Sequence, residues 1–210
     1  MHCVLVTDIF GENRWTDTLT RSWQANLAGQ VNYSVVSPYR EHLTFKDETY
    51  AYRAFCSQGG LKTLTNILAA HLTELTGPVV VLGFSAGAAA AWQVAARQLE
   101  VDLVHTLGFY PGQIRHHLDL VPDSDVSLFF PKEESHFDLD PVVQVLSATE
   151  SCRVFRGAHG HGYINPNSEH YDEKASQAAL NALMPIDQLC MASRDFIEGL
   201  ASALNYREIL

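Results

Sequence analysis

Short apolar runs rich in β-branched and aromatic residues alternate with longer helix-like segments along most of the chain. Such runs are typical of buried strands, and their alternation with helices indicates βαβ units. The pattern therefore predicts an α/β protein with a mainly parallel sheet of about six strands and helices on both faces. The expected strands are Cys3–Thr7, Tyr33–Ser37, Val79–Leu82, Leu103–Phe109, Val126–Phe130 and Cys152–Phe155, and the expected helices span residues 16–28, 60–76, 86–99 and 140–149.

Two further stretches have less regular patterns. The tail from Tyr171 to Tyr206 is predicted to be helical with a break near Pro185, because proline cannot donate to the helical hydrogen-bond ladder. Residues 40–58 are polar and form a long connection, which is either a solvated loop or a lid over a substrate site. The sequence contains no internal repeat and no linker-like stretch, so residues 1–210 are expected to form a single domain.

The most informative segment joins an expected strand to an expected helix. The apolar run Pro78–Leu82 leads into Gly83-Phe84-Ser85-Ala86-Gly87, and an alanine-rich stretch follows. Gly-x-Ser-x-Gly between a strand and a helix is typical of a nucleophile elbow, a sharp turn that exposes one serine hydroxyl at the sheet edge. The two glycines allow the backbones to crowd together, and Ser85 would then lie at a helix N-terminus, where free N–H groups favour negative charge.

Composition and charge narrow the range of functions. The chain has 24 acidic and 14 basic residues and a net charge of −10, so we expect no nucleic-acid binding and no binding to anionic membranes. No signal peptide and no run of transmembrane length is visible. The cysteines are widely spaced, which favours a cytoplasmic protein with reduced thiols; they are Cys3, Cys56, Cys152 and Cys190.

A glycine-rich segment with two histidines follows the last expected strand, Arg156-Gly157-Ala158-His159-Gly160-His161-Gly162-Tyr163. A serine nucleophile needs a histidine base, and such a loop can hold one at the sheet edge. Spacing alone does not choose between His159 and His161. The pair could also bind a metal, but no third ligand with metal-site spacing accompanies it, so we expect no metal and no other cofactor.

Four segments in this order make the chain similar to the dienelactone hydrolase family of α/β-hydrolases, over most of its length. The resemblance implies an α/β-hydrolase fold. Because longer members begin with extra strands, the chain looks like an N-terminally trimmed version. The segments are Val4-Leu5-Val6-Thr7-Asp8-Ile9-Phe10-Gly11-Glu12-Asn13; Gly83–Gly87 with Phe109-Tyr110-Pro111-Gly112; Leu128-Phe129-Phe130 with Ser135-His136-Phe137; and Gly160-His161-Gly162-Tyr163 with Asn165-Pro166 and Tyr171-Asp172.

The same resemblance implies roles for single residues. Ser85 corresponds to the nucleophile, which is Cys in some members and Ser in others, and His161 rather than His159 corresponds to the catalytic histidine. The backbone N–H groups of Ile9 and Ala86 fall on the oxyanion hole. Asp8 falls on an acidic residue that contacts the resting nucleophile in the Cys members, although a turn or cap role is equally open. The candidate substrate-pocket residues are Asp8, Phe10, Phe84, Tyr110 and Tyr163.

The third member of a catalytic triad is where the chain departs from the family. Ser135 stands where members carry the orienting Asp, and a serine has no charge to stabilise an imidazolium. Glu134 could replace it through its longer side chain, with Glu133 and Asp138 as weaker candidates. These acids could equally form a solvated charge run. The family's substrate-carboxylate arginine is also unmatched, so a carboxylate substrate is not implied.

Two functions remain open at this stage. The first is a serine hydrolase that cleaves a small ester, lactone or thioester through an acyl-Ser85 intermediate. The alternative is a catalytically degenerate α/β-hydrolase fold that binds a ligand or partner without turnover. A Glu or Asp oxygen within hydrogen-bond reach of His161 favours the first, and its absence favours the second. Acyl transfer to an acceptor other than water would use the same site, and the sequence does not specify the oligomeric state.

Overall fold

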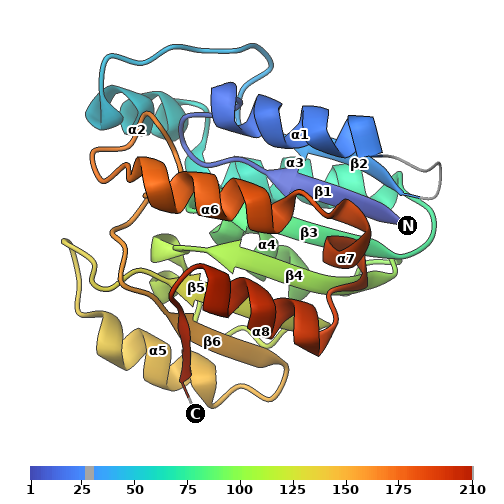
Figure 1. The fold of residues 1–210 in the computed structure, drawn as a ribbon. Coiled ribbons are helices and arrows are strands. Elements are labelled where there is room, and N and C mark those ends of the chain that lie inside the picture. Colours follow the sequence, from blue (N-terminus) through green and yellow to red (C-terminus); the bar gives the residue numbers. More distant parts are fainter. Residues whose placement is uncertain (27–30, 210) are drawn as a thin grey trace.

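Seven strands form one sheet in the order β2-β1-β3-β4-β5-β6-β7 (Figure 1). The structure is a computed structural model that describes residues 1–26 and 31–209. The first six strands are parallel, and β7 pairs antiparallel with β6. The strands are β1 (His2–Val6), β2 (Asn32–Val36), β3 (Val79–Phe84), β4 (Leu103–Phe109), β5 (Asp125–Phe130), β6 (Cys152–Arg156) and β7 (Arg207–Ile209).

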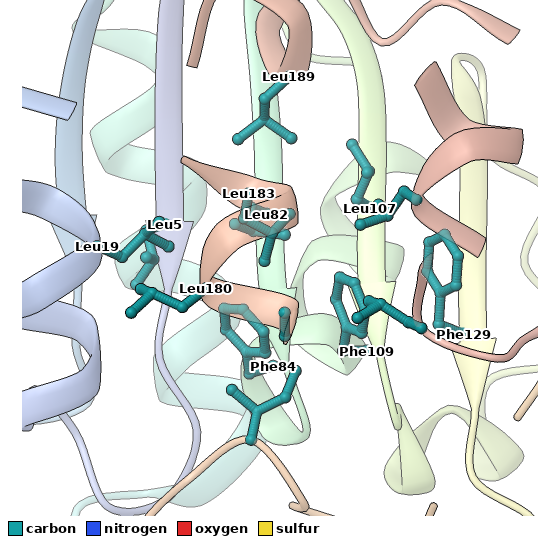
Figure 2. Close-up of a cluster of buried hydrophobic side chains, with 14 of the residues drawn as sticks. Leu5, Leu19, Leu82, Phe84, Leu107, Phe109, Phe129, Leu180, Leu183 and Leu189 are labelled. Carbon is teal, nitrogen blue, oxygen red and sulfur yellow. The ribbon is translucent and has the colours of Figure 1, made fainter. Parts of the chain in front are cut away.

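Helices cover both faces of this sheet (Figure 1). On one face, leucines and phenylalanines of the central strands pack against α1, α6, α7 and α8 (Figure 2). On the other face, α2, α3, α4 and α5 cover the strands. The helices are α1 (Arg14–Asn26), α2 (Glu48–Ser57), α3 (Gly60–Thr73), α4 (Ala86–Ala95), α5 (Leu139–Ser147), α6 (Glu173–Leu183), α7 (Ile186–Met191) and α8 (Arg194–Ala203), and a short 3₁₀ helix, η1, spans Gly112–His116.

The small side chains of α4 let it pack closely on the sheet. Every residue of this helix except Gln93 is buried, and most are alanine or glycine. Its first turn lies against the carboxyl end of β1, where a Cβ placed on Gly87 would be 2.4 Å from the carbonyl oxygens of Val6 and Thr7. A Cβ on Gly83 would likewise be 2.7 Å from the Ala88 backbone. These contacts require glycine at both ends of the turn that carries Ser85.

Replacing Gly87 with alanine is therefore expected to destabilise the protein. The added methyl group meets two backbone carbonyls that cannot move aside, and overpacking of this kind costs about 1–3 kcal/mol or more. Gly199→Ala is the matched control, because Gly199 is an exposed interior position of α8 where an added Cβ would meet nothing within 4 Å. That change should stabilise the protein by up to about 1 kcal/mol. Urea denaturation of both variants gives the comparison; equal stability would contradict the packing argument.

The predicted helices are present, with different ends. The helix expected at 16–28 begins two residues earlier, and residues 27–28 lie outside the described part of the chain. The helices expected at 60–76 and 86–99 end at Thr73 and Ala95. The predicted break near Pro185 is confirmed, since α6 ends at Leu183 and α7 begins at Ile186. Apolar periodicity locates a helix better than it locates its ends, where packing decides.

Two elements differ from the sequence prediction. The connection at residues 40–58 is not simply a loop, because α2 occupies its second half. Asp47 caps this helix by accepting from the Tyr50 N–H, and Ala51 and Phe55, four residues apart, are buried against the sheet side. The expected six strands are joined by β7, whose three residues are too few for a recognisable pattern and which pairs with β6.

None of the described helices is long and apolar enough to cross a membrane. All four cysteines are free thiols; Cys3, Cys152 and Cys190 are buried and Cys56 is exposed. The cytoplasmic location suggested by the cysteine spacing stays a prediction.

Candidate active site

Ser85 occupies a strained turn between β3 and α4. Its φ of 48° and ψ of −112° lie in a region that residues other than glycine rarely adopt, which confirms the conformation predicted for an elbow. The Ser85 N–H donates to the Phe109 carbonyl over 2.9 Å, and the Ser85 carbonyl accepts the first helical hydrogen bond of α4, from Ala89. Hydrogen bonds to β4 and α4 thus fix the Ser85 backbone.

His161 contacts the Ser85 hydroxyl from the loop that follows β6. The distance from Ser85 Oγ to His161 Nε2 is 2.8 Å, a hydrogen bond of the kind that joins a nucleophile to its base. Gly162, with a φ of 77°, turns the chain directly after the histidine. The Tyr110 ring lies 5.1 Å from the imidazole and packs beside it. The imidazole is therefore held with Nε2 facing the serine.

Glu134 contacts the opposite nitrogen of the same imidazole. Its Oε1 lies 2.8 Å from His161 Nδ1, and its side chain is only 6% exposed. A carboxylate at this point accepts a hydrogen bond from His161 Nδ1–H, which leaves Nε2 as the acceptor for the Ser85 hydroxyl. The other two acids are elsewhere: Glu133 is exposed, and Asp138 caps α5 by accepting from the Asp140 N–H. Of the three acids considered from the sequence, Glu134 is the one beside His161.

His159 faces a different direction. Its ring stacks on Tyr163 at 4.6 Å, and its Nδ1 lies 3.8 Å from Asp172 Oδ2. The His159 carbonyl accepts the Lys132 N–H over 2.9 Å, which ties the histidine loop to the loop that carries Glu134. The structure thus separates the two histidines that spacing alone could not distinguish.

The expected oxyanion donors lie where β1 and α4 meet. Ala86 is the first residue of α4, and the leading N–H groups of a helix have no partner within it. Ile9 lies in a turn that the Gly11 N–H closes onto the Asp8 carbonyl at 3.1 Å, and the Tyr39 hydroxyl donates to the Ile9 carbonyl over 2.7 Å. Their role as oxyanion donors stays a prediction.

Comparison with known proteins shows the family of this chain. Residues 3–186 match the dienelactone hydrolase family. The chain belongs to this family. It is therefore a hydrolase-family protein with the α/β-hydrolase fold, as the resemblance of its motifs implied. The uncharacterized protein YczH of Bacillus subtilis (strain 168) is 27% identical over 176 residues, which are 80% of this chain and 83% of that protein.

Solved structures show the same fold at low sequence identity. A candidate dienelactone hydrolase of Klebsiella pneumoniae subsp. pneumoniae MGH 78578 superposes with a TM-score of 0.61 at 14% identity, over 97% of this chain and 85% of that one. The dienelactone hydrolase-like promiscuous phosphotriesterase P91, from metagenomic libraries, gives a TM-score of 0.59 at 16% identity, over 88% and 84%. Est1E of Butyrivibrio proteoclasticus gives 0.52 at 12% identity, over 91% and 88%.

In this member of the dienelactone hydrolase family, the acidic residue after β1 is deeply buried. Asp8 is 6% exposed; its Oδ1 accepts the Phe10 N–H at 2.9 Å and its Oδ2 accepts the Asn165 amide at 2.6 Å. Burial raises the pKa of Asp8 from an ordinary value of 3.8 to about 6, and the two hydrogen bonds and nearby His161 offset only part of this effect. The carboxylate of Asp8 is thus kept next to the site at a cost in stability.

This burial predicts how stability depends on pH. The folded protein holds the Asp8 proton up to about pH 6, whereas the unfolded chain releases it near pH 3.8, so the contribution of this group to stability falls as pH rises between these values. The loss is on the order of 3 kcal/mol. Asp8→Asn removes the titration, so its stability relative to wild type should increase from pH 4 to pH 7 in denaturant titrations. If the difference in unfolding free energy between the variant and wild type is constant with pH, the pKa of Asp8 is not raised by burial.

The expected pocket residues divide into two groups. Asp8, Phe84 and Tyr110 line a small cavity of about 10 Å³ beside the elbow, together with Asn165. Phe10 and Tyr163 do not line this cavity; they are core residues, 5% and 0% exposed. An apolar residue next to a catalytic motif is as suited to the core as to a pocket, and the sequence does not distinguish the two.

Sequence reasoning missed two residues beside the site. A Cβ on Gly112 would lie 3.3 Å from both Glu134 Oε1 and His161 Cε1, so η1 begins directly against this pair. Asn165, which is 4% exposed, bonds to Asp8. Asn165 was part of the family resemblance, in the dipeptide Asn165-Pro166, but nothing in the sequence indicated that it contacts Asp8.

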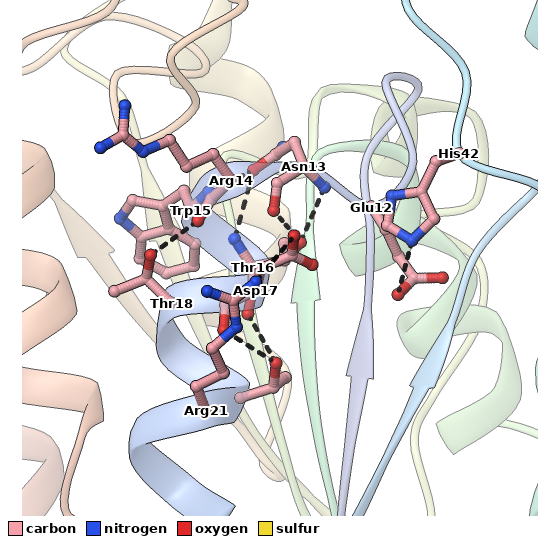
Figure 3. A network of polar contacts seen from close by, with 10 residues as sticks. Glu12, Asn13, Arg14, Trp15, Thr16, Asp17, Thr18, Arg21 and His42 are labelled. Atoms are coloured by element: carbon pink, nitrogen blue, oxygen red, sulfur yellow. Dashed lines mark hydrogen bonds and ion pairs between the residues drawn. The ribbon is translucent and has the colours of Figure 1, made fainter.

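Within the described residues, one group of side chains has ligand atoms close enough to share a metal ion, and it does not include either loop histidine. It consists of Glu12, Asp17 and His42 (Figure 3). His42 Nε2 lies 3.8 Å from a Glu12 carboxylate oxygen, and Asp17 pairs with Arg21 at 4.0 Å.

Proposed function

We propose that the protein is a serine hydrolase that cleaves a small ester, lactone or thioester through an acyl-Ser85 intermediate. The observation that supports this most strongly is the continuous relay from Ser85 Oγ to His161 Nε2 and from His161 Nδ1 to Glu134 Oε1, with both distances 2.8 Å. A nucleophile, its base and an acid that orients the base are the groups that acyl transfer requires. The carboxylate comes from position 134, next to the serine at position 135.

In the first half of the reaction, His161 removes the Ser85 proton as Oγ attacks the carbonyl carbon. The negative charge that develops on the substrate oxygen accepts hydrogen bonds from the Ile9 and Ala86 N–H groups, and the N-terminal end of α4 adds favourable electrostatics. The imidazolium is stabilised by Glu134. Collapse of the tetrahedral intermediate transfers the imidazolium proton to the leaving group and leaves Ser85 acylated.

In the second half, water takes the place of the leaving group. His161 removes a proton from this water, which attacks the acyl carbon, and the resulting intermediate collapses to release the acid and the Ser85 hydroxyl. Ser85, His161 and Glu134 return to their starting protonation states. The same geometry would serve transfer to another nucleophile, and product analysis in water with and without added alcohols or thiols separates the two.

The function is tested by labelling and turnover together. A fluorophosphonate probe should react covalently with Ser85, as located by peptide mass spectrometry, and short p-nitrophenyl esters should be hydrolysed. Loss of labelling in Ser85→Ala provides the control. A protein that is neither labelled nor active on short esters and thioesters would instead support the alternative, a fold that binds a ligand without turnover.

Replacing Glu134 with glutamine is expected to lower kcat by about 10⁴-fold with little change in KM. The amide cannot stabilise an imidazolium and it favours the wrong tautomer of His161, as for the acid of other triads. Glu133→Gln is the matched control, since Glu133 is exposed and one residue away. Ser135→Asp should not raise the rate, because Glu134 already occupies Nδ1. An unchanged rate in Glu134→Gln, or a large gain in Ser135→Asp, would show that Glu134 does not serve as the acid.

A further inference from the structure

Asp8 joins two segments that lie far apart in the sequence. Its Oδ1 accepts the Phe10 N–H at 2.9 Å and so closes the turn that contains Ile9. Its Oδ2 accepts the side-chain amide of Asn165 at 2.6 Å, across a sequence separation of 157 residues. One carboxylate thus connects the turn after β1 to the loop after β6.

Asn165 is itself fixed to the loop that carries His161. Its N–H donates to the Gly162 carbonyl over 2.9 Å, one residue beyond the histidine. Its side-chain oxygen accepts the Asn167 N–H at 2.9 Å, which determines that the NH₂ group faces Asp8. The neighbouring Ile164 carbonyl accepts the Ser176 hydroxyl at 2.8 Å, which ties the loop to α6. The orientation of Asn165 is therefore set by the loop.

The relay Ser85–His161–Glu134 is complete without this pair. A buried carboxylate nevertheless destabilises a fold unless its interactions compensate, and core positions are usually apolar. Retaining one here suggests a requirement for its hydrogen bonds. Acyl transfer has such a requirement, because the oxyanion donors and the base must be positioned together, and a misplacement of about 1 Å can cost about 10²-fold in rate.

We propose that Asp8 and Asn165 form a positioning clamp that holds the Ile9 turn and the His161 loop at a fixed separation. This inference rests on the proposed function for its effect on catalysis, but not for its effect on structure. Asp8 and Asn165 are positioning residues and touch no reacting atom in this scheme. The clamp acts through two hydrogen bonds rather than through the chemistry of the carboxylate.

The charges around Asp8 require a test that separates hydrogen bonding from charge. His161 and Glu48 interact electrostatically with its carboxylate, and so do the ionisable side chains of Tyr39 and Tyr110. A negative charge at position 8 could therefore act directly on His161. Removing it alone would change both the charge and the clamp.

An exchange of the two residues keeps the clamp and moves the charge. In Asp8→Asn, two NH₂ groups face each other, and in Asn165→Asp, two carboxylates do. In the double variant Asp8→Asn/Asn165→Asp, the amide oxygen now at position 8 still accepts the Phe10 N–H, and the NH₂ group there donates to the carboxylate at position 165. That carboxylate still accepts the Asn167 N–H. Every hydrogen bond of the clamp is thereby restored, and only the one between positions 8 and 165 reverses its direction.

Asp119→Asn, at an exposed position, is the control for loss of one charge.

Each single variant should lower kcat on p-nitrophenyl acetate by about 10–100-fold, with KM changing much less, and the double variant should recover most of this loss. Hydrogen–deuterium exchange should rise in segments 8–11 and 161–168 of the single variants and return to the wild-type level in the double variant. A merely structural role would lower the melting temperature without changing the kcat of the folded protein.

The two readouts distinguish the possible failures. If wild type neither reacts with a fluorophosphonate nor hydrolyses esters, the proposed function fails, while the exchange data still test the clamp. If single variants exchange like wild type, the clamp is wrong. If the double variant restores slow exchange but not kcat, the charge at position 8 acts directly and the clamp does not explain the rate. A single variant that fails to fold still leaves the double variant as the test.

Discussion

Replacing Ser85 with alanine should lower kcat for short esters by about 10⁵–10⁶-fold and abolish fluorophosphonate labelling. The serine supplies the atom that forms the acyl bond, and no other hydroxyl is bonded to His161 Nε2 among the described residues. The fold should be retained, because the strained turn is held by backbone contacts, the Ser85 N–H to Phe109 and the Ser85 carbonyl to Ala89, rather than by the hydroxyl.

The control is Ser202→Ala, an exposed serine at the end of α8, which should remain fully active. Circular dichroism and thermal melting establish that both variants are folded. If Ser85→Ala retains activity near the wild-type rate, catalysis does not use an acyl-serine. The alternative mechanism would then be direct attack by water activated by His161.

Replacing His161 with alanine should cost nearly as much, about 10⁵–10⁶-fold in kcat, because members of a triad act as a unit. Without the imidazole, the Ser85 hydroxyl loses the base that lies within hydrogen-bond reach, and Glu134 loses its partner. A double variant with Ser85→Ala should be no slower than either single one. This lack of additivity is itself the measurable sign of a shared mechanism.

His159→Ala provides the matched control, two residues away in the same loop. His159 stacks on Tyr163 and faces Asp172, so its loss should affect stability more than the rate. Should His159→Ala abolish turnover while His161→Ala remains active, the assignment of the base would be wrong by two residues.

The sequence predicted the elbow well because its determinants are local. A buried strand, two glycines around a serine and a run of alanines are contiguous, and each residue type has a steric reason for its place, as the 2.4 Å approach to Gly87 shows. The helix α2 was not predicted, because its local pattern is weak. Only Ala51 and Phe55 are buried, within an otherwise polar stretch. The strand β7 has only three residues, and its pairing with β6 determines it.

The sequence ranked Glu134 first among three candidate acids, but it did not show which of them contacts His161. Glu133, Glu134 and Asp138 lie close together in one loop, and a one-residue offset there turns a side chain toward or away from the site. In the folded protein the Glu134 side chain is 6% exposed and contacts His161, while Asp138 caps α5. Asn165 was likewise not assigned to Asp8, because nothing in its neighbourhood along the chain indicates a partner at the other end of the protein.

What the sequence by itself determined is the set of features encoded by neighbouring residues: the order of strands and helices, the turn at Ser85, and a histidine-bearing loop after the last parallel strand. The tertiary structure alone decided which side chains meet. The contacts Ser85–His161, His161–Glu134 and Asp8–Asn165 span 76, 27 and 157 residues. Such contacts depend on how strands order in the sheet and how loops leave their carboxyl ends, and hydrophobic periodicity carries no information on either.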